Sequence, residues 1–204
     1  MTIASRRNRE KEEMKMAILQ VARDIAARDG WQNLTIRKIC DEIHYTAPVI
    51  YQHFESKDMI LLSLRLEGFV MVYKDFEIVN QKYTDPARRL LEYGLSFWKF
   101  AENNPELYQV MFNLQGAICS EEGKQRSLEN VRKHYRECLE AINSRAARSE
   151  KFMWELYDNF TAVIHGFITI HMVNKIKSGK ENARTVFKNS LERFIHSIND
   201  KKND

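Results

Sequence analysis

The sequence is poor in residues that interrupt helices and in features that mark secreted or membrane proteins. Seven glycines and three prolines among 204 residues are too few for a β-rich fold with many turns. No apolar run reaches the roughly 18 residues that a membrane-spanning helix needs, and no secretory segment precedes the first predicted helix. The three cysteines, Cys40, Cys119 and Cys138, are odd in number and scattered. We therefore expect a cytoplasmic protein with no membrane segment and no disulfide framework.

Signals for catalysis and for metal binding are also missing. The chain has no nucleophile elbow, no phosphate-cradling glycine loop and no paired catalytic carboxylates with a supporting base. No two histidines lie four residues apart, and no Cys/His pair has the spacing of metal ligands. We expect no enzymatic activity, no cofactor and no metal. The net charge of +4 permits nucleic-acid binding but does not by itself argue for it.

The most informative stretch runs from residue 35 to residue 57. Thr35 is a good N-cap residue, and apolar residues then recur at helical spacing at Ile36, Ile39, Cys40 and Ile43. The period breaks at His44, and Thr46 can cap a second helix. Pro48 falls in the first turn of that helix, where its missing N–H does no harm. Two short helices separated by a tight break predict a helix-turn-helix.

This stretch resembles the DNA-binding motif of the TetR family of bacterial transcriptional regulators, most clearly in the run of Tyr51, His53, Phe54 and Lys57. The resemblance implies an all-α homodimer. It would contain a three-helix helix-turn-helix domain over residues 1–56 and a helical-bundle domain for ligand binding and dimerisation over residues 57–204. One position departs from the family pattern: His44 stands where the family usually has glycine, and His tolerates a left-handed backbone better than most residues.

Within the second short helix, Ile50 and Phe54 are expected to face the core. The apolar side chains at the helix start can contact thymine methyl groups, and Gln52 can pair with adenine. The resemblance implies that Arg37 contacts a base or a phosphate, and that Tyr51, His53 and Lys57 contact phosphates. The candidate DNA-binding residues are Arg37, Thr46, Ala47, Pro48, Val49, Tyr51, Gln52, His53 and Lys57.

Each of these assignments has a plainer alternative. For Tyr51 and His53 it is an aromatic pair that packs on neighbouring helices. Lys57 begins a helix, where a cation is unfavourable by roughly 0.3–1 kcal/mol, so it suits a site that holds an anion; its alternative is an ordinary exposed lysine. Residues 1–9 contain three arginines and form either a solvated tail or an arm that lies along DNA.

Apolar periodicity predicts a first helix over residues 10–28 and a long helix over residues 57–81, which would connect the two domains. Residues 152–177 are apolar on nearly all sides and, with a helix over residues 182–198, predict a four-helix dimer interface. The alternative is a monomer whose own core covers both faces.

The second half also resembles a TetR-family C-terminal domain named for a Trp-His-Gly motif, although Ile164 stands at the Trp position before His165 and Gly166. The aromatic and methionine side chains of this half would ordinarily be explained as a hydrophobic core. The resemblance favours a pocket for an effector among them. The candidate ligand-binding residues are Phe97, Trp98, Met111, Phe112, Tyr135, Tyr157, Phe160 and His165. Because acidic residues are expected on outer faces, the predicted ligand is neutral or weakly polar and largely hydrophobic.

The sequence therefore predicts a ligand-responsive transcriptional regulator. It would be a repressor that binds a pseudo-palindromic double-stranded DNA operator as a homodimer and is released by a small hydrophobic effector. Two alternatives stay open. One is a constitutive DNA-binding adaptor of the same fold without a ligand. The other is an all-helical enzyme or lipid carrier that retains a vestigial helix-turn-helix.

Overall fold

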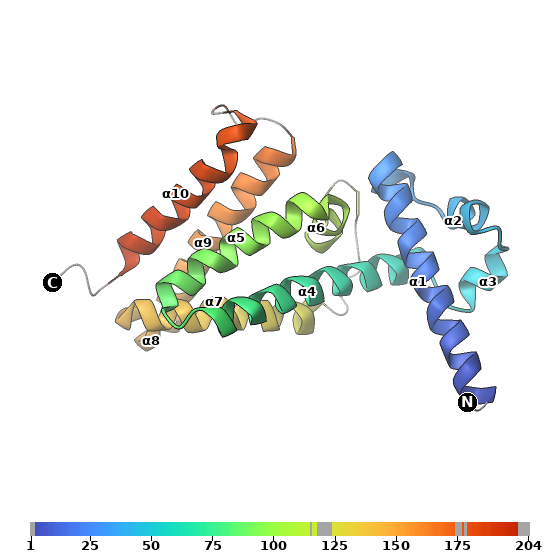
Figure 1. Ribbon diagram of the computed structural model, residues 1–204, viewed down its shortest axis with the longest axis horizontal. Helices are drawn as coiled ribbons and strands as arrows, with labels where there is room; N and C mark the ends of the chain where they lie inside the picture. The colour runs from blue at the N-terminus through green and yellow to red at the C-terminus, as the bar shows by residue number, and fades with distance from the viewer. Residues whose placement is uncertain (1–2, 115, 118–123, 174–176, 178, 200–204) are drawn as a thin grey trace. The chain divides into compact units, whose positions relative to one another are not determined.

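The structure is a computed structural model that describes residues 3–114, 116–117, 124–173, 177 and 179–199. Cys119 and residues 174–176 of one predicted helix lie outside the described residues. All regular secondary structure in the described part is helical, which confirms the predicted fold class (Figure 1). The elements are α1 (Ile3–Asp29), η1 (Trp31–Asn33, a 3-10 turn), α2 (Ile36–Ile43), α3 (Ala47–Tyr51), α4 (Lys57–Lys82), α5 (Pro86–Asn103), α6 (Pro105–Met111), α7 (Lys124–Ile142), α8 (Ser144–Arg148), α9 (Glu150–Met172) and α10 (Lys180–Ile198).

Contacts divide the chain into two compact units. The first contains the described residues of 1–68 and 104–124, and the second contains those of 69–103 and 125–204. The division falls inside α4 and groups α6 with the N-terminal helices. The domain boundary expected between residues 56 and 57 was set by the end of the DNA-binding motif, whereas the contacts divide the chain between residues 68 and 69. The functional boundary at residue 57 stays a prediction.

In the first unit, α1 is longer than the sequence predicted. It begins at Ile3, so residues 3–9 are helical and do not form a frayed tail or an extended arm. Ion pairs one turn apart explain the extension: Arg6 Nε lies 2.8 Å from Glu10 Oε1, and Arg9 Nε lies 3.1 Å from Glu13 Oε1. Polar pairs of this kind leave no apolar period, which is why apolar spacing missed this part of the helix.

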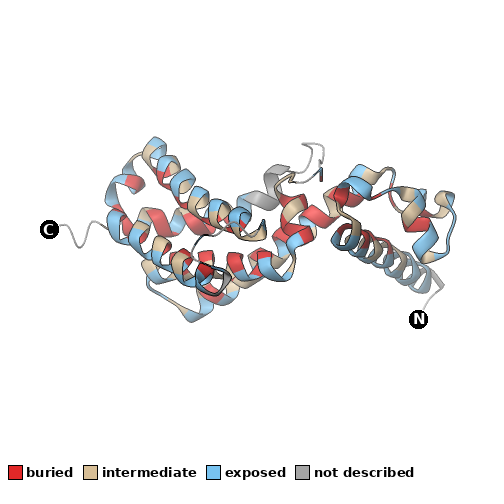
Figure 2. Cartoon of the chain, turned by 90° about the horizontal axis from the view of Figure 1, so that it is seen from above, coloured by how far each residue is buried: buried red, intermediate tan, exposed pale blue. Residues whose placement is uncertain are grey.

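The core of the first unit forms under the C-terminal half of α1. Ile18, Ala22 and Ile25 have no exposed surface, and Trp31 and Leu34 are also buried. Figure 2 shows buried and exposed residues alternating along the helices. Gly30 ends α1 with a φ of 84°, a backbone conformation that glycine adopts without strain.

The turn between α2 and α3 has the geometry that the sequence predicted. The Thr35 side chain accepts a hydrogen bond from the Lys38 backbone N–H at 3.2 Å, so Thr35 caps α2. His44 ends α2 in the left-handed region, with φ 58° and ψ 38°. Thr46 occupies the N-cap position of α3 but its side chain makes no capping hydrogen bond, which corrects the cap expected there. The left-handed His44 therefore turns the chain from α2 into α3.

A buried ion-pair network joins α1, α4 and α6 within the first unit. Arg23 Nη2 lies 2.8 Å from Glu106 Oε1, and Arg23 Nη1 lies 3.1 Å from Glu67 Oε1. Asn104 Oδ1 accepts a further bond from Arg23 Nη2 at 3.2 Å, and Trp31 Nε1 donates to the Glu106 carbonyl oxygen at 3.1 Å. These contacts satisfy both the side chain and the backbone at the start of α6, and so hold α6 in this unit.

The second unit packs α5, α9 and α10 through large aromatic side chains. The Trp98 ring stacks on Phe187 with centroids 4.8 Å apart. Gly94 allows close approach of α5 and α10, because a Cβ there would lie 2.5 Å from Leu191 Cδ1. Buried residues occupy one stripe of α9, namely Met153, Leu156, Phe160, Ile164 and Ile168. The helix ends at Met172, earlier than the predicted residue 177.

Candidate nucleic-acid interface and candidate ligand site

The helix-turn-helix separates an inner face from an outer face. Ile50 is fully buried and Phe54 is 7% exposed, so both belong to the core as predicted. Arg37, Thr46, Pro48, Tyr51 and Gln52 are exposed, while Ala47, Val49, His53 and Lys57 are half-buried. The nine candidate DNA-binding residues are therefore accessible at least in part. Their contacts with DNA stay a prediction.

Tyr51 is 52% exposed, an unusual position for a large aromatic side chain with a polar end. The exposure disfavours the alternative in which Tyr51 packs into the neighbouring helices. Tyr45, in the turn after His44, is 48% exposed and was not among the predicted site residues. An aromatic residue directly after a left-handed turn was the only sequence signal for it. Two tyrosine side chains are thus presented beside α3.

The start of α4 offers donors for an anion. Ser56 Oγ accepts a hydrogen bond from the Met59 backbone N–H at 3.3 Å, so Ser56 caps the helix, and Lys57 is its first residue. Backbone N–H groups at a helix start carry partial positive charge, which favours a phosphate near Lys57. Burial lowers the pKa of His53, and the nearby Lys11 and Lys15 of α1 lower it further. Glu12, also on α1, acts in the opposite direction and raises this pKa, so His53 lies beside charges of both signs on α1.

The predicted ligand-binding residues fall into two groups. Six of them lie in the second unit and are Phe97, Trp98, Tyr135, Tyr157, Phe160 and His165. Several contact one another: the Tyr135 and Phe160 ring centroids are 5.2 Å apart, and those of Phe97 and His165 are 5.6 Å apart. Met111 and Phe112 belong to the first unit, where Phe112 packs on Tyr108 at 5.0 Å. The predicted lining is therefore not one cluster within one unit.

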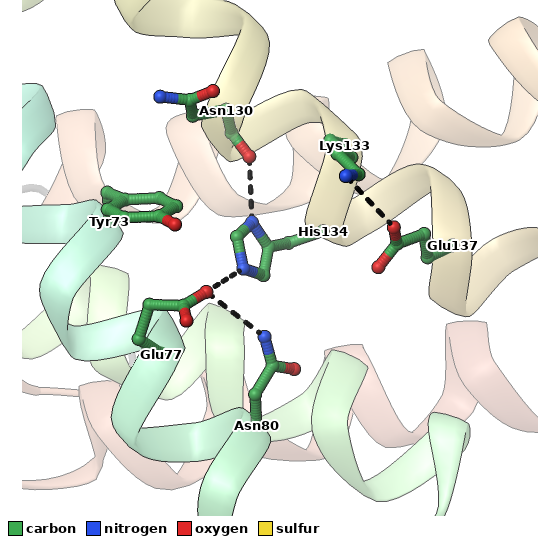
Figure 3. A pocket seen from close by; sticks show the side chains of 7 residues that line it. All are labelled: Tyr73, Glu77, Asn80, Asn130, Lys133, His134 and Glu137. Atoms are coloured by element: carbon green, nitrogen blue, oxygen red, sulfur yellow. Dashed lines mark hydrogen bonds and ion pairs between the residues drawn. The ribbon is translucent and has the colours of Figure 1, made fainter.

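A polar hollow of about 180 Å³ lies between α4 and α7 in the second unit (Figure 3). Its lining shares no residue with the predicted ligand site and consists of Tyr73, Glu77, Asn80, Asn130, Lys133, His134 and Glu137. Two carboxylates and an ammonium group suit water or a small polar molecule better than an apolar one.

His134 links the two helices at the edge of this hollow. Its Nδ1 lies 2.7 Å from the Asn130 carbonyl oxygen, and its Nε2 lies 2.8 Å from Glu77 Oε1 (Figure 3). Both partners offer oxygen atoms as hydrogen-bond acceptors to the imidazole ring. The bond from His134 lowers the pKa of Glu77. The contact between His134 and Glu77 is therefore a partly buried link between α4 and α7.

The described residues bear on the expected absence of a metal site and of a membrane segment. They contain no group of three His, Cys, Asp or Glu side chains placed to hold a metal ion. None of the helices among them is both long enough and apolar enough to span a membrane.

Comparison with known proteins bears on the N-terminal helices first. A family model described as bacterial regulatory proteins, tetR family, matches residues 18–64. The match begins in α1 and ends in α4, so it covers the whole helix-turn-helix. No curated protein matches the sequence.

Solved structures share the fold along nearly the whole chain. A TetR-family transcriptional regulator from Bordetella parapertussis has a TM-score of 0.67 at 16% identity, covering 90% of this chain and 94% of that chain. PfmR, a TetR family transcriptional regulator from Thermus thermophilus, has a TM-score of 0.64 at 18% identity, covering 88% and 97%. A variant of TetR from Acinetobacter baumannii, in complex with minocycline, has a TM-score of 0.62 at 16% identity, covering 88% and 93%.

At these identities the solved structures establish the fold, and the family-model match adds the DNA-binding motif. An all-helical chain that presents such a motif belongs to the helix-turn-helix DNA-binding regulators. Within that class, residues 18–64 match the TetR family of bacterial regulatory proteins, and solved structures of TetR-family transcriptional regulators share the fold of the chain.

Proposed function

We propose that the protein is a ligand-responsive repressor that acts in the cytoplasm. It binds a pseudo-palindromic operator as a homodimer and leaves the operator when a small hydrophobic effector binds. The observation that carries the proposal is the helix-turn-helix itself. The left-handed His44 holds α3 at the surface, and Tyr51, Gln52 and Lys57 lie on or beside its accessible face.

The homodimer is supported by an uncovered stripe on α9. Ala162, Gly166 and Ile170 follow one another at four-residue steps and are exposed, and Val173 continues the stripe with 45% exposure. A Cβ built on Gly166 meets no atom within 4 Å, so another helix has room to approach closely there. We infer that a second copy of α9 covers this stripe and that α10 completes the interface.

Effector binding is supported by the aromatic cluster of the second unit and by the continuity of α4. That helix begins at the predicted phosphate contact Lys57 and continues to Lys82 in the second unit. An effector that binds better to one position of α4 shifts the population of that position and so changes operator affinity. The buried aromatic lining favours a neutral or weakly polar compound. One neighbour of this fold, the TetR variant from Acinetobacter baumannii, is in complex with minocycline.

The test begins with selection of DNA sequences by the purified protein from a random duplex library, followed by affinity measurements on the recovered site. Lys57→Ala should weaken binding to all sequences alike and reduce the slope of log affinity against log salt by about one unit for each half-site, or about two for the homodimer, because each subunit loses one phosphate contact. Gln52→Ala is the matched variant, which should alter base preference instead.

Failure to recover a pseudo-palindromic site would overturn the proposal, and a change in base preference at one position in Lys57→Ala would overturn the assignment of Lys57. Hydrophobic compounds are then screened for release of the same operator complex. If none releases it, the constitutive adaptor becomes the better description.

A further inference from the structure

The N-terminal half of α1 continues the inner face of that helix with positive charge. Ile18, Ala22 and Ile25 form the fully buried inner face. Lys11 and Arg7 lie seven and eleven residues before Ile18, about two and three helical turns, so each falls within about 20° of Ile18 around the helix axis. Both are exposed. The face of α1 that is apolar and buried from Ile18 to Ile25 therefore carries positive charge at Lys11 and Arg7, nearer the N-terminus.

The other charges of this segment are paired with one another. Arg6 pairs with Glu10, Arg9 pairs with Glu13, and Lys15 Nζ lies 3.0 Å from Glu12 Oε1. In the described part of the chain, neither Arg7 nor Lys11 takes part in an ion pair. Two cations without carboxylate partners therefore remain on one face of a segment whose remaining charges balance locally.

That face is turned toward the helix-turn-helix. α1 packs on α2 along its inner stripe, and its N-terminal half extends past α2 and α3 (Figure 1). Lys11 and Lys15 are near enough to His53 to disfavour a charge on its ring. His53 is one of the residues predicted to contact phosphate. Lys11 and His53 consequently belong to one surface of the first unit, and Arg7 lies about one turn beyond Lys11 on the same face of α1.

A surface of like charges repels itself unless an anion neutralises it. We propose that Arg7 and Lys11 bind two phosphates of the DNA backbone beside the bases that α3 contacts, so that α1 is a second backbone-binding element. The inference rests on the proposed operator binding. It assigns to a rigid helix the contact that the sequence left open for a flexible arm. Contacts of this kind strengthen binding without reading sequence.

The test compares two double variants with the same change in net charge in the same segment. Arg7→Gln/Lys11→Gln removes the two unpaired cations. Arg6→Gln/Arg9→Gln removes two cations that are paired and that lie about 120° or more from Ile18 around the axis. Operator affinity is measured between about 50 and 200 mM salt, where phosphate contacts dominate the change. Circular dichroism and thermal unfolding verify that both variants remain folded.

We expect the Arg7/Lys11 variant to reduce the salt slope by about 1.8 for each half-site, or about 3.6 for the homodimer, and to weaken binding at about 0.1 M salt by roughly 4,000-fold, the effect of two lost phosphate contacts in each subunit. Each of the two ion pairs that the Arg6/Arg9 control removes contributes little to the stability of the helix. The control should therefore keep the start of α1 helical and change the slope by less than about half a unit. The exchange Arg7→Lys/Lys11→Arg should keep the wild-type slope.

Equal slopes in the two double variants would overturn the inference while operator binding by the wild type stands. A wild type without salt-dependent affinity for any DNA would overturn the proposed function as well. The two failures are therefore distinguishable in one series of titrations.

Discussion

His165 is a titratable residue that is held largely away from water. It lies on α9 with its ring edge-on to Phe97, at a centroid distance of 5.6 Å. Burial lowers the pKa of His165 to about 4, so its ring is neutral at pH 7. In the unfolded chain the same ring titrates near its ordinary value of about 6.5.

This difference predicts a pH dependence of stability with a definite sign. Between about pH 6.5 and 4 the unfolded chain binds a proton that the folded chain does not bind, so the free energy of unfolding falls as the pH falls through this window. The stabilisation is complete above about pH 6.5, and up to about 3 kcal/mol is lost by pH 4. Urea unfolding at a series of pH values measures it.

The matched control is His196→Gln, because His196 is exposed on α10. The variant His165→Gln should lose most of the dependence in this window, whereas His196→Gln should retain it. Identical profiles for His165→Gln and the wild type would assign the acid sensitivity to other groups.

Among single residues, the sequence did not predict which charged side chains are buried. Glu106 is only 8% exposed, and its ion-pair partner Arg23 lies 83 positions earlier in the chain. Acidic residues were expected on outer faces because burial of an unpaired carboxylate is unfavourable. The partner that makes burial possible comes from another helix, and no local pattern reveals it. The link between His134 and Glu77 was hidden in the same way.

Among the elements, the turn between α2 and α3 depends most on one backbone conformation. A residue with a Cβ in the left-handed region is strained by about 1–2 kcal/mol, and glycine is not. Because His44 is exposed, its replacement removes little packing. His44→Gly should therefore raise the free energy of unfolding by about 0.5–1 kcal/mol after the larger entropy of glycine in the unfolded chain is counted.

Asp41→Gly provides the opposite case, since Asp41 is exposed inside α2 with ordinary helical geometry. Glycine there should lower the free energy of unfolding by a few tenths of a kcal/mol. Thermal unfolding of both variants gives the comparison. A loss of stability in His44→Gly would show that the imidazole contributes more than its backbone strain costs.

Helices with apolar periods or strong caps were predicted to within a few residues. α4 was expected over residues 57–81 and runs from Lys57 to Lys82, and α10 was expected over residues 182–198 and runs from Lys180 to Ile198. α1 was missed at its start because that segment is stabilised by charge pairs and has no apolar period. Apolar periodicity therefore predicted a helix correctly where one face of the helix is buried, and failed where the helix is exposed on all sides.

For the whole molecule, the family resemblance predicted the fold class, and the division into compact units did not follow from the sequence. α6 joins the first unit because Arg23 and Trp31 hold Glu106, contacts that span 83 and 75 positions. Contacts between residues so far apart in the sequence leave no repeating pattern from which they could be predicted. The same limit applies to the ligand site, where two of the eight predicted lining residues fall in the other unit.

Assembly is the property of the whole molecule that the exposed stripe on α9 makes testable. Ile170 is 46% exposed in the single chain, and a carboxylate at this position would be buried without a partner if a second α9 covers the stripe. We expect Ile170→Glu to sediment as a monomer and to lose operator affinity by more than about tenfold, because only a dimer contacts two half-sites at once. Ala141→Glu adds the same charge at an exposed position of α7 and should remain dimeric. If Ile170→Glu instead sediments as the wild type does and binds the operator normally, the interface lies on another face and the stripe on α9 has a different role.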